Sequence, residues 1–220
     1  MNFVSHAVVA SWRATDPAWV FGAMLPDFAS MARCRVLGAD EPRVSEGLAH
    51  HHATDEVFHH ARSFIALNDE GVRTLSAHGV RRGPARAVAH VGVELMLDGL
   101  LLDDPGIERT YLRAISVDSD SLGLRFRGTG GPRFAEFSVR LRAHGLPNAY
   151  RTPEGVLTRL EQTLSRRPRL AWTADETPEI LAWLRGMRHR LALVLPTLLG
   201  EVRLGLEAGS HTDARSPSPG

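Results

Sequence analysis

The chain has 220 residues, with 26 lysines and arginines against 25 aspartates and glutamates, and this balanced charge gives no global field that favours nucleic acid or an anionic membrane. The length is enough for one sizeable core and so predicts a single domain. The one cysteine excludes an internal disulfide. We find no segment with the positive region of a signal peptide, and none with the about 20 apolar residues of a membrane helix. For these reasons we expect a cytoplasmic protein.

Apolar residues recur every three or four positions along most of the chain, and no segment alternates for more than a few residues. This period predicts an all-α protein, a single-domain helical bundle over residues 1–208. The expected helices, in chain order, cover residues 3–12, 17–24, 43–67, 83–103, 107–116, 132–143, 153–165 and a long last segment from residue 177.

Prolines, glycines and small polar residues predict where these helices end. Pro26 is expected to stop the second helix, and Pro196 to kink or split the last one. Residues 116–132 are rich in serine, aspartate and glycine, which indicates a loop or a small hairpin. Residues 209–220 have no apolar side chain large enough to dock, and we expect a disordered tail there.

The segment 47–60 gathers histidines on an expected helix. His51, Asp55 and His59 are spaced by four, so they lie on one helix face and offer an imidazole, a carboxylate and a second imidazole. First-row divalent metals bind such a set. The alternative is a histidine-rich solvated face, or a core histidine with satisfied hydrogen bonds.

A second stripe with the same spacing consists of His90, Glu94 and Asp98. Its neighbours are almost all apolar, which predicts a buried helix, and a buried ionised carboxylate needs a cation nearby. Arginine could supply that cation, because the chain has many. Two stripes of histidine and carboxylate favour a metal.

Five short motifs in a consistent order resemble the acyl carrier protein phosphodiesterase family, helical hydrolases that remove 4'-phosphopantetheine from holo acyl carrier protein. Residues 1–6 (MNFVSH) are similar to the family's MNFLAH, 22–28 (GAMLPDF) to GNLLADF, 47–55 (GLAHHHATD) to its glycine-led HRxxD element, 94–101 (ELMLDGLL) to DxxxDHFL, and 164–170 (LSRRPRL) to SRRPRL. The chain departs from the family pattern at three positions, with His52 in place of arginine, Gly99 in place of histidine and Glu94 in place of aspartate.

The resemblance implies an HD-domain-like metal phosphohydrolase of fatty acid and lipid metabolism that uses manganese or magnesium. A divalent ion polarises the phosphoryl oxygen and lowers the pKa of water. The ligands expected from it are Asp27, His51, Asp55 and Asp98.

Two further residues are assigned to catalysis. His6 is expected to be a ligand or a proton-transfer group, and Glu94 a ligand, a support for the ligands or the general base. Two of the assigned residues have a structural alternative. His6 could be a core histidine with satisfied hydrogen bonds, and the expected ligand Asp27 could be a helix cap.

Arg166, Arg167 and Arg169 form a compact basic element between two expected helices. Arginine suits bidentate contact with phosphate, and the element could equally dock an acidic acyl carrier protein. The alternative is a solvated helix end whose positive charges complement the helix dipole.

The leading functional hypothesis is a metal-dependent phosphodiester hydrolase that acts on holo acyl carrier protein, without nucleic acid or membrane as a partner. A diverged hydrolase of another phosphate ester and a non-catalytic metal-containing binding module are the alternatives. A redox di-metal bundle would need paired Glu-x-x-His elements, and the sequence does not have such a pair.

Overall fold

The structure is a computed structural model that describes residues 1–213, with side chains described as far as residue 209. It confirms the all-α prediction. The α-helices are α1 (Phe3–Ser11), α2 (Pro17–Met31), α3 (Pro42–His60), α4 (Arg62–Ala77), α5 (Arg82–Leu101), α6 (Pro105–Ile115), α7 (Gly130–His144), α8 (Pro153–Leu164) and α9 (Thr177–Asp213). The short elements are the strands β1 (Val36–Gly38) and β2 (Arg125–Phe126) and the 3₁₀ helices η1 (Ser119–Leu122), η2 (Asn148–Arg151) and η3 (Ala174–Glu176).

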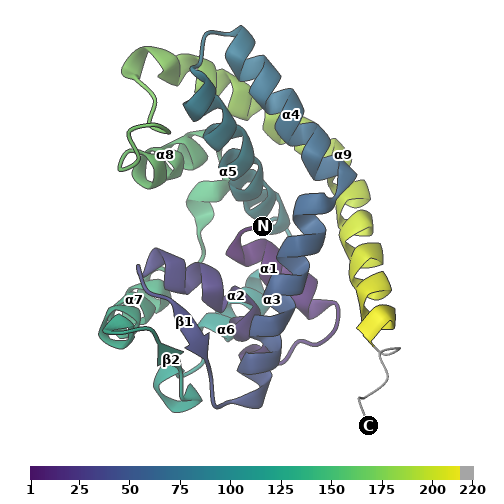
Figure 1. Ribbon diagram of the computed structural model, residues 1–220, viewed down its shortest axis with the longest axis vertical. Helices are drawn as coiled ribbons and strands as arrows, with labels where there is room; N and C mark the ends of the chain where they lie inside the picture. The colour runs from purple at the N-terminus through teal and green to yellow at the C-terminus, as the bar shows by residue number, and fades with distance from the viewer. Residues whose placement is uncertain (214–220) are drawn as a thin grey trace.

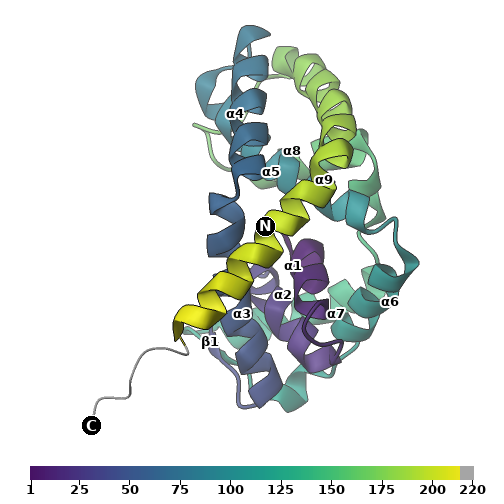
Figure 2. The ribbon, with the colours of Figure 1, turned by 90° about the vertical axis from the view of Figure 1, so that its right-hand side faces the viewer.

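Helix α1 lies at the centre of the molecule. Every residue from Phe3 to Ala10 is buried, and α1 packs against α2, α3, α5 and α6. Figures 1 and 2 show α4, α5 and α8 above it, α2, α3, α6 and α7 below it, and α9 running along both parts. The start of α1 therefore lies where the two parts of the molecule meet.

Helices α2 and α3 approach each other closely because glycines face the partner backbone. A Cβ atom on Gly47 would lie 2.2 Å from the carbonyl oxygen of Trp19, and one on Gly22 would lie 2.3 Å from that of Val44. Neither position has room for a side chain. This approach brings His51, one turn after Gly47, against the backbone of α2.

We expect Gly47→Ala to lower the free energy of unfolding by about 1–3 kcal/mol, because overpacking forces the two backbones apart. Urea denaturation measures this loss. Gly186→Ala in α9 is the matched control, since a Cβ there meets nothing within 4 Å and alanine should gain about 0.5–1 kcal/mol in a helix. Equal stability of the two variants would contradict the predicted clash.

Two predicted helix boundaries were wrong, and of the two outcomes expected at Pro196, a kink or a split, the split does not occur. Helix α2 continues through Pro26 to Met31, because the buried side chains of Leu25 and Phe28, worth about 1.5–3 kcal/mol each, offset the cost of about 3 kcal/mol for an internal proline. The expected helix 43–67 is two helices, broken at Ala61, whose backbone is extended. Helix α9 is not split at Pro196, although Figure 2 shows it bending along its course.

The segment 116–132 forms no local hairpin. It contains η1 and the strand β2, which pairs in antiparallel fashion with β1, so that Val36 lies opposite Phe126. The expected tail 209–220 was also wrong at its start, because α9 continues to Asp213; residues 214–220 lie outside the described residues. Within residues 1–213, no helix combines the length and the apolar character that a membrane crossing requires.

Glu176 ties the segment before α9 to the start of α5. Its carboxylate accepts hydrogen bonds from the backbone N–H of Arg81 at 2.7 Å and from the Arg81 guanidinium at 2.8 Å. It also accepts from the backbone N–H of Thr173 at 2.7 Å, which completes a capping box. These bonds hold two segments together that are far apart in the sequence.

The pH dependence of stability should report this contact. Hydrogen bonding from Arg81 lowers the pKa of Glu176 from its ordinary 4.5 to about 2. A lowered carboxyl pKa gives stability that is present above pH 4.5 and is lost as the pH falls towards 2. We expect Glu176→Gln to lose about 1–2 kcal/mol at neutral pH, as for a helix cap, and to differ less from the parent at pH 2.

Urea unfolding of both proteins from pH 7 to pH 2 measures this difference. Glu56→Gln, exposed in the interior of α3, is the matched control and should change the free energy of unfolding by less than about 0.5 kcal/mol at neutral pH. A gap between parent and Glu176→Gln that is constant with pH would contradict the assignment.

Candidate metal centre

One group of candidate ligands joins the first three helices. His6 of α1, Asp27 of α2 and His51 of α3 place their ligand atoms within 4.8 Å of one another. Each side chain comes from a different helix, so the group exists only in the folded chain. The structure thus brings together three residues that the sequence analysis assigned to the site.

The rings of the two histidines in this group stack, with centroids 3.9 Å apart. His51 Nδ1 lies 2.8 Å from the carbonyl oxygen of Ala23, which can only accept, so Nδ1 carries the hydrogen and Nε2 keeps a free lone pair. Burial lowers the pKa of His51 to about 3, and it lowers the pKa of His6 as well. Neutral imidazole with an oriented Nε2 is the form that binds a metal.

Polar atoms of this group have no hydrogen-bond partner among the described residues. Both ring nitrogens of His6 and Oδ2 of Asp27 are buried without a hydrogen bond, although Nε2 of His6 lies 3.2 Å from Oδ1 of Asp55 and 4.0 Å from Oδ2 of Asp27. Burial raises the pKa of Asp27 well above its ordinary range. Unpaired buried polar atoms cost about 1–3 kcal/mol each, and a bound cation would satisfy the carboxylate and an imidazole together. The residues present therefore fit a divalent ion.

Asp55, one turn after His51 on α3, lies beside this group on its solvent side. Its Oδ1 is 3.2 Å from Nε2 of His6, without the alignment of a hydrogen bond, and its Oδ2 is 3.7 Å from Nε2 of His51. The Asp55 side chain is 35% exposed, against 1% for His6. Asp55 is therefore more accessible to solvent than the histidine that it faces.

A second group lies next to the first and is more open. Its members are His59 of α3 and His90 and Glu94 of α5, again with ligand atoms within 4.8 Å of one another. Oε1 of Glu94 is 3.2 Å from Nε2 of His59 and 3.4 Å from Nε2 of His90, and the two rings stack at 5.2 Å. Burial opposes ionisation of Glu94, but hydrogen bonds with His59 and His90 hold its pKa well below the usual range.

The α-ammonium group of Met1 lies between the two groups. Its nitrogen is 3.0 Å from Oδ1 of Asp55 and 3.0 Å from Oε1 of Glu94. Burial lowers the pKa of this amine, but the charges of Glu94 and Asp55 outweigh the burial and raise it. A cation is therefore already stabilised between the two carboxylates, at the place marked N in Figures 1 and 2.

Asp98 has a different role from the one predicted. Its carboxylate accepts hydrogen bonds at the start of α1 from Nδ2 of Asn2, from the backbone N–H of Val4, and from both the N–H and the hydroxyl of Ser5. Burial raises the pKa of Asp98 to about 7, against the opposing effect of the Ser5 and Val4 donors. Asp98 belongs to neither group of candidate ligands and instead fixes the helix that carries His6.

The remaining predicted positions lie outside the two groups. Arg166, Arg167 and Arg169 are exposed, and the carbonyl of Arg169 packs against Gly83, about two turns of α5 before His90. A Cβ on Gly99 would lie 1.9 Å from the carbonyl oxygen of Tyr150. The histidine that the resemblance places at this position cannot fit there, so the departure reflects packing.

The sequence analysis placed His59 and His90 on the two stripes but assigned neither of them to the site. The spacing by four did put His59 on the stripe of Asp55, and His90 on that of Glu94. The spacing within each stripe does not show which residues of α3 and α5 meet across the two helices. Only the contact of Glu94 with both histidines shows that they form one group.

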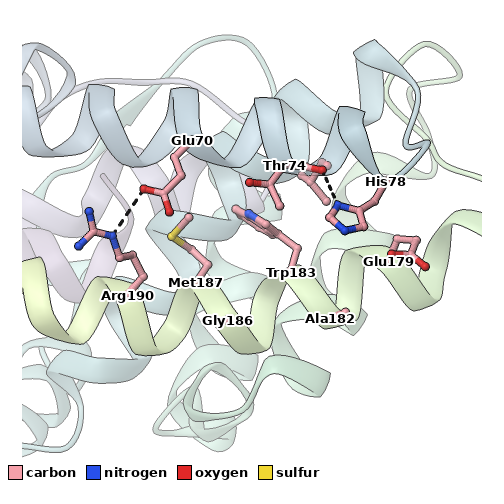
Figure 3. Close-up of a pocket in the computed structure, with 10 residues that line it drawn as sticks. Glu70, Thr74, His78, Glu179, Ala182, Trp183, Gly186, Met187 and Arg190 are labelled. Carbon is pink, nitrogen blue, oxygen red and sulfur yellow. Dashed lines mark hydrogen bonds and ion pairs between the residues drawn. The ribbon is translucent and has the colours of Figure 1, made fainter.

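A separate cavity of about 370 Å³ lies between α4 and α9 (Figure 3). In its lining, Arg190 lies 3.5 Å from Glu70, and His78 Nδ1 lies 2.8 Å from the backbone carbonyl of Thr74. None of the candidate ligands lines it. This cavity is not part of the candidate metal centre.

Comparison with models of known protein families, with curated proteins and with solved structures found no match. The assignment of chemistry therefore depends on the geometry of these side chains and on the motifs in the sequence.

Proposed function

We propose that this chain is a metal-dependent phosphoric diester hydrolase. The observation that carries the proposal is the first group of ligands, in which His6, Asp27 and His51 meet from three helices with buried atoms left unpaired. Asp55 completes this set from the solvent side. A structural zinc site closes all its positions with protein, whereas a hydrolytic site leaves one open, and the exposure of Asp55 favours an open site.

Each group has its own task in this proposal. His6, Asp27, His51 and Asp55 hold a divalent ion, Mn²⁺ or Mg²⁺. When bound, the ion supplies a positive charge that polarises the phosphoryl oxygen and lowers the pKa of water. His59 and His90 are partly exposed beside this ion and pair with Glu94 through Nε2, and an imidazole of this group would supply the proton that the leaving oxygen needs.

The substrate in this proposal is holo acyl carrier protein, from which 4'-phosphopantetheine is released. Support comes from the motif residues Asp27, His51 and Asp55, which two of the similar segments place in matching positions and which lie at one centre. The exposed Arg166, Arg167 and Arg169 would then bind the acidic carrier protein outside the centre.

The test is intact-mass measurement of purified holo acyl carrier protein after incubation with this protein and Mn²⁺ or Mg²⁺, with a chelator as control. Metal-dependent loss of the prosthetic group is the expected result. Intact carrier protein together with metal-dependent hydrolysis of bis-p-nitrophenyl phosphate would replace the substrate and keep the reaction class. If the protein binds Mn²⁺ but catalyses neither of these two reactions, the proposed hydrolase function is overturned.

A second candidate is a metal-containing binding module without turnover. The α-ammonium group of Met1 favours it, because this amine already compensates Asp55 and Glu94 and fills the space between the two groups. In that case calorimetry would detect Mn²⁺ binding, while both phosphodiesters stay intact.

A further inference from the structure

A second cavity, of about 540 Å³, lies between α7 and α8 and is lined mainly by apolar side chains. Its buried floor comes from distant segments: Phe3 of α1, Tyr111 of α6 and Tyr150 of η2. Figure 1 shows α7 and α8 on the same side of the molecule, one below and one above the level of the N-terminus. The volume is within the range of about 300–1,000 Å³ that small-molecule sites occupy.

One arginine in the lining has no acidic partner. Arg159 on α8 is half-buried, and among the described residues no carboxylate lies within 4.0 Å of its guanidinium. Its polar contact is the hydroxyl of Tyr150. The other arginine in the lining, Arg140 of α7, pairs with Glu136. Partly burying a guanidinium without an anion nearby costs free energy, and a bound anion would offset this cost.

Charge differs between the rim and the floor of the cavity. The exposed lining includes Arg140 and His144 besides Arg159. At the floor, the negative charge of Asp98 acts on the hydroxyls of both Tyr111 and Tyr150 and helps to raise their pKa values, mainly set by burial. Because Arg140 is paired with Glu136, Arg159 is the lining arginine whose charge favours an anionic group beside it.

The floor also offers one free polar atom. The hydroxyl of Tyr111 is buried without a hydrogen-bond partner among the residues that the structure describes. The rest of the floor is apolar, from Phe3 and the ring of Tyr150, with Phe137 and Leu141 of α7 beside them. Such a lining fits an apolar body and tolerates at most one polar group inside.

We propose that this cavity binds a small amphiphilic anion, whose carboxylate or phosphate pairs with Arg159 and whose apolar body lies against Phe3, Phe137 and Tyr150. The inference goes beyond the proposed hydrolase and does not depend on it, because none of the candidate metal ligands lines the cavity.

Calorimetric titrations of the full chain in chelator test the chemistry, with decanoate and decyl phosphate as anions and decanol and decyltrimethylammonium as controls, all below their micelle concentrations. We expect the anions to bind at least tenfold more tightly than the neutral and cationic chains. The better of the two anions identifies the head group. Equal affinity for decanol and for both anions would overturn the proposal.

The variant Arg159→Met keeps an apolar stem and removes the charge, and it should lose at least tenfold in affinity for the anion with no change for decanol. Tyr150→Phe, which removes only the hydroxyl beside Arg159, should show a smaller loss. Arg142→Met, an exposed arginine of α7 outside the lining, is the matched control. Unchanged anion affinity in a folded Arg159→Met protein would overturn the assignment.

Methionine methyl resonances locate the ligand independently. Met31 lines this cavity, whereas Met187 lines the cavity between α4 and α9. In protein labelled with ¹³C-methyl methionine, decanoate should shift the Met31 signal and leave Met187 in place. A shift of Met187 alone would move the ligand to the other cavity and reject the proposal.

Discussion

Replacing Asp55 by asparagine should abolish metal-dependent phosphodiester hydrolysis and weaken Mn²⁺ binding at least about 100-fold. Mutation of residues that only orient metal ligands already lowers metal affinity or activity by about 10–100-fold. Asparagine keeps the shape of the side chain but removes the charge that faces His6, His51 and the Met1 amine. Calorimetry with Mn²⁺ and the phosphopantetheine-release assay measure the two losses separately.

Asp69→Asn is the matched control, since Asp69 is exposed on α4 and lies outside both groups of ligands. Circular dichroism should show both variants folded. Unchanged Mn²⁺ affinity in a folded Asp55→Asn protein would remove Asp55 from the metal ligands, and retained hydrolysis would reject the proposed mechanism. Loss of hydrolysis with metal affinity intact would assign Asp55 to substrate or water instead.

Helix spacing predicted much of the centre. Residues four apart share a helix face, and so His51 with Asp55, and His90 with Glu94, could be paired from the sequence. Distances between different helices follow from packing, which spacing does not contain. The meeting of His6, Asp27 and His51 depends on the close approach of α2 and α3 at Gly22 and Gly47, and glycine alone does not reveal which backbone it faces.

The errors share a physical cause, since local signals were read without the tertiary contacts that override them. Pro26 is a helix breaker in isolation, but buried neighbours hold α2 together around it. The spacing by four puts Asp98 on the same helix face as Glu94, and for this reason the two were expected at one site. Carboxylates one turn apart on one face can still meet different partners. Glu94 faces His59 and His90, whereas Asp98 reaches the start of α1.

The role of Asp98 leads to a large expected effect on stability. Asp98→Ala removes the acceptor for the buried backbone N–H groups of Val4 and Ser5, each of which costs about 1–3 kcal/mol when left unpaired, so we expect a loss of about 2–6 kcal/mol in the free energy of unfolding. Urea denaturation measures it. Asp104→Ala, which removes an exposed cap of α6, should lose only about 0.5–2 kcal/mol.

Asp98→Asn separates a cap from a ligand. Its amide oxygen can still accept from Val4 or Ser5, and so the helix that carries His6 should stay in place while the negative charge is lost. If Asp98 only fixes α1, this variant keeps Mn²⁺ affinity within a few-fold of the parent and loses stability. If Asp98 held the ion, affinity would fall about as far as in Asp55→Asn, and the original assignment of Asp98 as a ligand would have to be restored.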